Sequence, residues 1–221
     1  TWSFLWRKVM VPLLDAGYRC VAPDMIGFGR SDKPTAIEDY TYDRHTEAMA
    51  HIVDALDLDE INFVFHDWGG PVGTRVAAEA KERVASTALM DTGFNTGDFK
   101  MSDTWQTFHD FVVRTEDLPI GFLVKGAVVN DLPEDVFNAY EAPFPNAQSK
   151  AGARAFPPLI PRSPDHPDAA SGREVLEHFV ASDWPKLVLL ADQKPVPPHK
   201  RRGNGIIHPT AAAAPHPRLT T

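Results

Sequence analysis

Short apolar runs alternate with amphipathic stretches along much of the chain. The apolar runs have the length of β-strands, and strands are expected over residues 18–23, 61–65, 84–90 and 187–191. Elsewhere apolar residues recur at helical spacing, and helices are expected over residues 1–16, from Thr41 to about Leu56 and from about Gly70 onward. Because the run at 61–65 is almost unbroken, we expect this strand to be buried on both faces. The alternation predicts a parallel α/β sheet.

The alternation is interrupted after the strand expected at 84–90. Residues 98–181 contain helical stretches around 105–114 and 134–140, followed by a proline-rich run from Pro143 to Pro167. We therefore expect this segment to be a mainly helical domain inserted into the sheet domain. The chain is therefore expected to divide into a first core segment (residues 1–97), the insertion (98–181), a second core segment (182–198) and a tail (199–221).

Composition narrows the classes of function. With 221 residues, 43% of them hydrophobic, the chain can bury a core and suits one domain with an insertion. No apolar run is long enough to cross a membrane, and a net charge of -8 argues against a nucleic-acid partner. The single cysteine, Cys20, lies in the strand expected at 18–23, so we expect an inert core residue in a reducing, cytoplasmic compartment.

The C-terminal tail differs from the rest of the chain in charge. All 30 acidic residues lie at or before Asp192, whereas residues 199–221 carry only basic charges and are rich in proline, alanine and histidine. Such a segment has little to pack, so we expect it to be disordered or to be the product of a shifted reading frame.

The candidate chemistry lies directly after the strand at 61–65, in the sequence His-Asp-Trp-Gly-Gly that ends at Gly70. A strand, a sharp turn and a helix with a polar residue at the apex form a nucleophile elbow. The apex residue here is Asp67, and a carboxylate in this place attacks carbon and forms an alkyl ester that water then hydrolyses. The alternative is that Asp67 caps the helix that follows. Elbows usually have a small residue two positions before the nucleophile, where this chain has Phe65.

At this motif the chain resembles the haloalkane dehalogenases of the α/β-hydrolase superfamily. Residues 22–34, 141–145 and 150–157 are also similar to segments of that family, and the resemblance runs from Thr1 to about Pro198. It implies an α/β-hydrolase fold in which the insertion is a mainly helical cap over the active site. It also implies that the first strands of the sheet would precede Thr1 and are missing from this chain.

The resemblance assigns roles to several residues. It makes Asp67 the nucleophile, and it makes the Trp68 indole N–H and the backbone N–H after the nucleophile donors to the leaving halide. Trp68 could instead be a core aromatic. In the cap, Phe108 occupies the family's second tryptophan position, and Trp105 lies one helical turn earlier. Whether Trp105 binds halide or packs in the cap stays open.

The acid and the base are less well defined. One branch of the family places the acid two residues beyond Asp192, where this chain has Lys194. Another branch matches Asp91, which we prefer, with Asp192 as second choice; Asp91 could also be a loop residue or a helix cap.

The spacings of His199 and His208 leave no room for the strand and helix that should precede the base. We expect His66 to point away from Asp67, and His45 and His51 to be structural.

These residues predict a haloalkane dehalogenase that acts on small halogenated alkanes, impaired in this chain because no base can be assigned. An epoxide hydrolase shares the Asp nucleophile, but its ring opening typically uses two cap tyrosines, and the predicted cap has one, Tyr140. A third hypothesis is a non-catalytic fragment of such an enzyme. We expect no cofactor, no metal and no membrane partner, and a monomer if the chain is complete.

Overall fold

The computed structural model describes residues 1–190, which form two compact units. The helical unit comprises Thr1–Ala48 and Met101–Ile160, and the sheet unit comprises Met49–Lys100 and residues 161–190. The candidates Asp192, Lys194, His199 and His208 and the predicted tail at 199–221 lie outside the described residues. Within residues 1–190, no helix is both long enough and apolar enough to span a bilayer.

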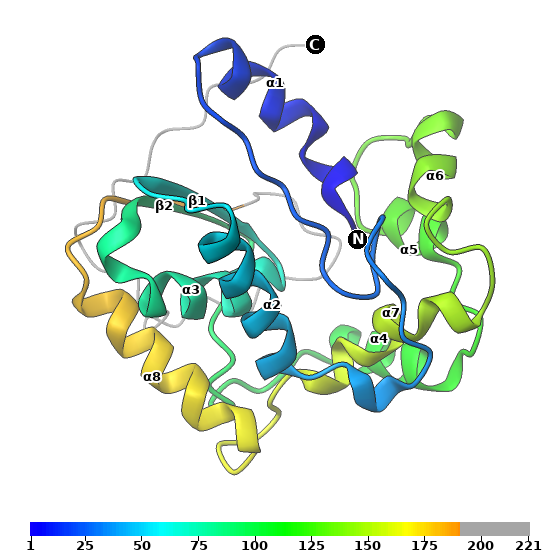
Figure 1. The fold of residues 1–221 in the computed structure, drawn as a ribbon. Coiled ribbons are helices and arrows are strands. Elements are labelled where there is room, and N and C mark those ends of the chain that lie inside the picture. The colour runs from blue at the N-terminus through cyan, green and yellow to red at the C-terminus, as the bar shows by residue number, and fades with distance from the viewer. Residues whose placement is uncertain (191–221) are drawn as a thin grey trace. The chain divides into compact units, whose positions relative to one another are not determined.

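The sheet unit is built on a parallel sheet of β1 (Ile61–His66), β2 (Val84–Met90) and β3 (Lys186–Leu189) in that order. Figure 1 labels β1 and β2. The strands end in register, because His66 pairs with Met90 and Met90 pairs with Leu189. The helix α3 (Gly69–Glu79) connects β1 to β2, and α8 (Pro167–Ala181) precedes β3. These strands confirm the sequence predictions at 61–65 and 84–90 and, shifted by one or two residues, at 187–191.

The helices α3 and α8 pack on one face of this sheet. The buried residues of this core come from β1, α3, β2 and α8: Phe65, Ala77, Leu89 and Phe179. On the opposite face of β1, Asn62 is exposed and Val64 is 37% exposed. The prediction that β1 is buried on both faces is therefore wrong for the described residues, because α3 and α8 cover only the side that carries Phe65.

Residues 18–23 are not a strand, contrary to the sequence prediction. They have no regular secondary structure, and Tyr18 and Val21 are 53% and 40% exposed. Apolar composition does not make a strand by itself, because a strand needs a neighbour to which its backbone can hydrogen bond. Within the described residues the sheet contains β1, β2 and β3 only. Cys20 is consequently half-buried and not a core residue.

The helical unit consists of short helices joined by loops. Its segments are η1 (Ser3–Trp6), α1 (Arg7–Asp15), η2 (Ile37–Asp39), α4 (Asp103–Arg114), α5 (Ile120–Gly126), α6 (Glu134–Glu141), η4 (Gln148–Lys150), α7 (Ala151–Ala155) and η5 (Pro157–Leu159). The helix α2 (Tyr42–Ala55) begins in this unit, and the Thr41 hydroxyl caps it by accepting the N–H of Arg44 at 3.1 Å, as predicted. Gly17 ends α1 with a φ of 87°, also as predicted.

The compact units do not follow the predicted domain bounds. The predicted cap at 98–181 includes α8, which packs on α3 in the sheet unit. This helix was missed in the sequence because the segment before it is rich in proline. Its own start signals are present, since His166 accepts the N–H of Asp168 and Pro167 occupies the first turn. The domain bounds inferred from the sequence stay a prediction.

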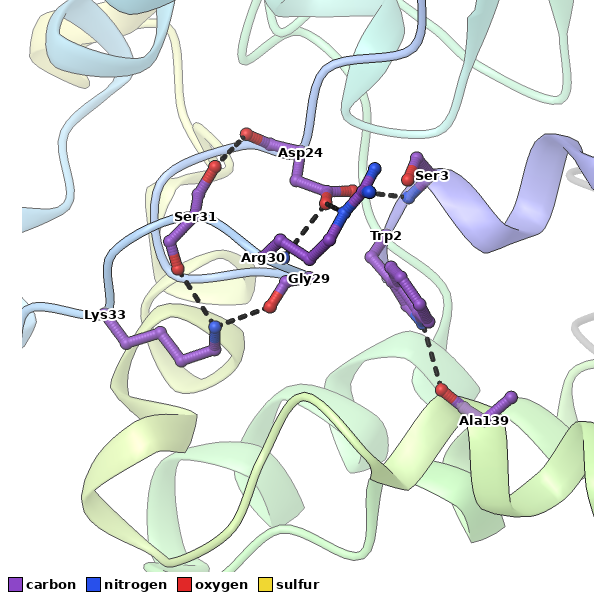
Figure 2. A network of polar contacts seen from close by, with 8 residues as sticks. All are labelled: Trp2, Ser3, Asp24, Gly29, Arg30, Ser31, Lys33 and Ala139. Atoms are coloured by element: carbon purple, nitrogen blue, oxygen red, sulfur yellow. Dashed lines mark hydrogen bonds and ion pairs between the residues drawn. The ribbon is translucent and has the colours of Figure 1, made fainter.

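A buried carboxylate organises the start of the helical unit. The Asp24 side chain is 5% exposed and accepts the backbone N–H groups of Ser3 at 2.6 Å and Arg30 at 3.0 Å (Figure 2). Burial raises the pKa of the Asp24 carboxyl, but the hydrogen bonds from Arg30 and Ser3 and the Arg30 charge outweigh it and hold this pKa below its ordinary value. A side chain at Gly29, whose φ is 51°, would collide with this carboxylate, so the turn requires glycine here.

The substitution Asp24→Asn should lower the free energy of unfolding by about 2 kcal/mol. The Asp24 carboxylate accepts one backbone N–H on each of its two oxygens. In the Asn variant an NH₂ group replaces one of these oxygens and cannot accept the hydrogen bond. Urea unfolding followed by circular dichroism measures the loss. The control is Asp32→Asn, which changes an exposed side chain of the same loop and should leave stability unchanged. Equal stability of both variants would show that the Asp24 contacts do not hold this loop.

A second buried polar residue in the helical unit, His45 on α2, is 1% exposed. Its ring centroid lies 4.6 Å from that of Phe156 and 6.0 Å from that of Tyr40. Neither ring nitrogen has a hydrogen-bond partner among the described residues. Burial, helped by the nearby Arg44 charge, lowers the pKa of His45 to about 4. The folded chain therefore holds a neutral imidazole packed between aromatic rings, which agrees with the structural role expected from the sequence.

The depressed pKa of His45 predicts a loss of stability on acidification. Between pH 6.5 and about 4 the unfolded chain takes up a proton at this position that the folded chain does not, so the free energy of unfolding falls by as much as about 3 kcal/mol. Replacing His45 by Leu should flatten this part of the stability profile in urea unfolding. His51→Leu, on an exposed face of the same helix, should leave the slope unchanged. Identical profiles in the three proteins would contradict the assignment.

Candidate active site

The turn between β1 and α3 has the geometry of the predicted nucleophile elbow. β1 ends at His66 and α3 begins at Gly69, so only Asp67 and Trp68 make the turn. Asp67 has a φ of 50°, in the left-handed region that residues other than glycine seldom adopt. Its carbonyl oxygen accepts the N–H of Gly70 at 2.9 Å, and its side chain is exposed. The turn therefore presents the Asp67 carboxylate at its apex.

Small residues allow α3 to start this close to the sheet. A side chain at Gly73 would collide with the ring of Phe65, and a side chain at Gly70 would collide with Thr92. Phe65 is the large residue that stands where elbows usually have a small one. Its ring occupies the space left by Gly73, so the departure at Phe65 is matched by the absence of a side chain on the facing helix.

The alternative of Asp67 as a helix cap finds no support at α3. Trp68 is the N-cap residue of this helix, and no side-chain cap hydrogen bond is made at this described terminus. Trp68 is half-buried. This degree of burial fits either a halide donor or a packing residue.

The preferred acid, Asp91, follows β2 as Asp67 follows β1. Because His66 and Met90 pair in register on adjacent parallel strands, Asp67 and Asp91 emerge side by side at the carboxyl edge of the sheet. Asp91 is half-buried, has a φ of 39°, and donates its N–H to the carbonyl of Leu189 at 3.2 Å. Ligands of open α/β sheets bind at this edge, and strained backbone often marks such sites.

Trp105 and Phe108 both lie on α4, in the helical unit. Trp105 is half-buried, and its ring stacks on that of His109 with centroids 5.3 Å apart. Phe108 is 40% exposed. The stacking favours a packing contribution from Trp105 and leaves its halide role a prediction. The contact with His109 was not anticipated from the sequence, although the spacing of four residues along a helix could have indicated it.

Two surface hollows occur elsewhere in the units. One of about 500 Å³ lies between the start of α1 and the segment from Val128 to Val136, and one of about 570 Å³ follows residues 180–186. Neither is lined by Asp67, Trp68 or Asp91. The candidate site is defined by the elbow geometry.

Comparison with known proteins agrees with this geometry. Residues 1–201 match the family model of the alpha/beta hydrolase fold. The chain is 40% identical to haloalkane dehalogenase 1 of Mycobacterium tuberculosis over 220 residues, which cover 99% of this chain and 73% of that protein. It is 38% identical to the haloalkane dehalogenase of Psychrobacter cryohalolentis over 196 residues, which cover 89% of this chain and 65% of that protein.

A solved structure shows the same relationship. A haloalkane dehalogenase from Paraglaciecola agarilytica, described as tetrameric, superposes with a TM-score of 0.79 at 32% identity. The match covers 86% of this chain and 63% of that one, so this chain spans less than two thirds of that relative's length. The alignment with the Mycobacterium tuberculosis protein covers 99% of this chain, so the resemblance does not stop near Pro198 as expected from the sequence.

The parallel sheet and the strand–turn–helix elbow define an α/β-hydrolase. The elbow carries Asp where the serine hydrolases of this fold carry Ser. Together with the relatives above, this places the chain in a particular group of that superfamily. The chain belongs to the haloalkane dehalogenase family.

Proposed function

We propose that this chain uses Asp67 to cleave carbon–halogen bonds of small halogenated alkanes. One carboxylate oxygen attacks the carbon that bears the halogen, a carbon–oxygen bond forms, and the halide leaves with the electron pair of the broken bond. The product is an alkyl ester of Asp67. The observation that carries the proposal is the exposed Asp67 carboxylate at the apex of a strained elbow, on the carboxyl edge of the sheet.

Hydrolysis of the ester completes the reaction. Water adds to the ester carbonyl carbon, its proton passes to a base, and the alcohol leaves as the carboxylate is restored. Asp91 would hold and charge-stabilise a histidine base, since it emerges beside Asp67 at the same sheet edge. The base itself is not assigned, because the spacings of His199 and His208 do not suit this role and both residues lie outside the described residues.

The epoxide hydrolase alternative gains nothing from Tyr140. This tyrosine of the predicted cap is 3% exposed, its ring packs edge-on against Phe4, and its hydroxyl accepts a hydrogen bond from Arg7 at 3.4 Å. A donor to an epoxide oxygen must reach the ligand with its O–H. The surroundings of Tyr140 therefore support a packing role and favour the dehalogenase proposal.

The substitution Asp67→Asn should reduce bromide release from 1-bromobutane by roughly a thousandfold or more, because no other group replaces a covalent nucleophile. When the reaction is stopped in acid before the ester is hydrolysed, intact mass spectrometry of the full chain should show one butyl group on the parent protein and none on the variant. Asp59→Asn, an exposed acid before β1, is the matched control and should react like the parent. Butylation that persists in Asp67→Asn would refute the proposal, and a parent that never reacts would favour the non-catalytic hypothesis.

Halide binding tests the roles of the tryptophans. Bromide should quench tryptophan fluorescence, and Trp68→Phe and Trp105→Phe should each weaken the response if both indoles donate to the halide. Trp2→Phe is the control, because the Trp2 indole N–H already donates to the Ala139 carbonyl at 3.1 Å (Figure 2). In the Trp105→Phe background, Phe108→Trp should restore the response if position 108 faces the halide. An unchanged titration in Trp105→Phe would leave Trp105 as a packing residue.

A further inference from the structure

The loop after β2 contacts the backbone of the candidate nucleophile. The hydroxyl of Thr92 donates a hydrogen bond to the carbonyl oxygen of Asp67 at 2.6 Å, across 25 residues of sequence. This approach depends on Gly70, because any side chain there would overlap the Thr92 side chain. A glycine in the first turn of α3 thus makes room for a hydroxyl that belongs to the next strand's loop.

The contact meets a specific need of the elbow. Asp67 holds a left-handed backbone, and such a conformation persists in a residue other than glycine only when its surroundings enforce it. Its carbonyl oxygen has two lone pairs, and two donors use them: the N–H of Gly70 at 2.9 Å and the hydroxyl of Thr92 at 2.6 Å. The N–H of Gly70 is part of the turn itself. Thr92 supplies the second bond from a separate strand connection.

The same contact fixes a second group of the candidate site. The carbonyl of Asp67 and the N–H of Trp68 belong to one planar peptide unit and point in opposite directions. Holding the carbonyl therefore also sets the direction of the Trp68 N–H, the backbone donor next to the nucleophile that would face the leaving halide. A rotation of this peptide would break both bonds to the Asp67 carbonyl and turn the Trp68 N–H away together.

We infer that Thr92 is a positioning residue for the alkylation step, which holds the peptide between Asp67 and Trp68 in its productive orientation. This inference rests on the proposed function of Asp67. Thr92 acts through the backbone and does not contact substrate, and it links the loop that carries Asp91 to the elbow that carries Asp67.

The test compares Thr92→Val, which keeps the shape and loses the hydroxyl, with Thr92→Ser, which keeps the hydroxyl. The first-order rate of butylation at saturating 1-bromobutane should fall roughly tenfold in Thr92→Val and stay within about twofold of the parent in Thr92→Ser. Thr87→Val is the matched control, since Thr87 is a buried threonine of β2 whose hydroxyl has no hydrogen-bond partner among the described residues. If Thr92→Val does not fold, Thr92→Ala removes the same hydroxyl.

Amide hydrogen exchange over residues 66–73 gives a readout that needs no haloalkane. Exchange should rise several-fold in Thr92→Val but not in Thr92→Ser or Thr87→Val, because the Gly70 N–H loses an ordered acceptor. A parent that neither becomes butylated nor releases bromide, with exchange that still responds to Thr92→Val, would refute the proposed function and support the positioning of the elbow. Unchanged exchange and rate in Thr92→Val, or equal defects in Thr92→Val and Thr92→Ser, would overturn the inference.

Discussion

The left-handed backbone of Asp67 is the constraint on which the sheet unit depends. A strand can turn into a helix within two residues only if the apex residue leaves the usual backbone regions and the following helix lies almost against the sheet. The close packing excludes side chains at Gly70 and Gly73, where Thr92 and Phe65 occupy the space. The choice of residues around the elbow, including the large Phe65, follows from this geometry.

The helical unit depends on buried polar groups that are satisfied to different degrees. Asp24 accepts two backbone N–H groups and is ionised at neutral pH, because these bonds compensate for its burial. Lys150, which is almost fully buried, meets the carboxylate of Asp117 at 2.5 Å and so ties the loop after α4 to the start of α7. His45, in contrast, has no hydrogen-bond partner among the described residues, and its burial between aromatic rings keeps it neutral. The contacts of Asp24 and Lys150 each hold a loop that apolar packing alone would leave unspecified.

Family membership and the local geometry support the same chemistry from independent directions. The alignments with haloalkane dehalogenases cover most of this chain, and the elbow presents a carboxylate where carbon–halogen cleavage needs a nucleophile. Asp91 follows the neighbouring strand, at the position that the resemblance to the family implies for the acid, and the register of β1 with β2 puts it beside Asp67.

The local signals in the sequence determined the strands expected at 61–65 and 84–90, the Thr41 cap, the Gly17 stop and the apex position of Asp67, because each depends on residues close together in the chain. Apolar composition alone misled at residues 18–23 and on the far face of β1, because a strand also needs a paired neighbour and a covering layer. Only the tertiary structure brought α8 onto α3 and Thr92 onto the Asp67 carbonyl. Those contacts join residues far apart in sequence. Which residues meet depends on the space left by a glycine or by a neighbouring helix, and the local sequence pattern does not contain that information.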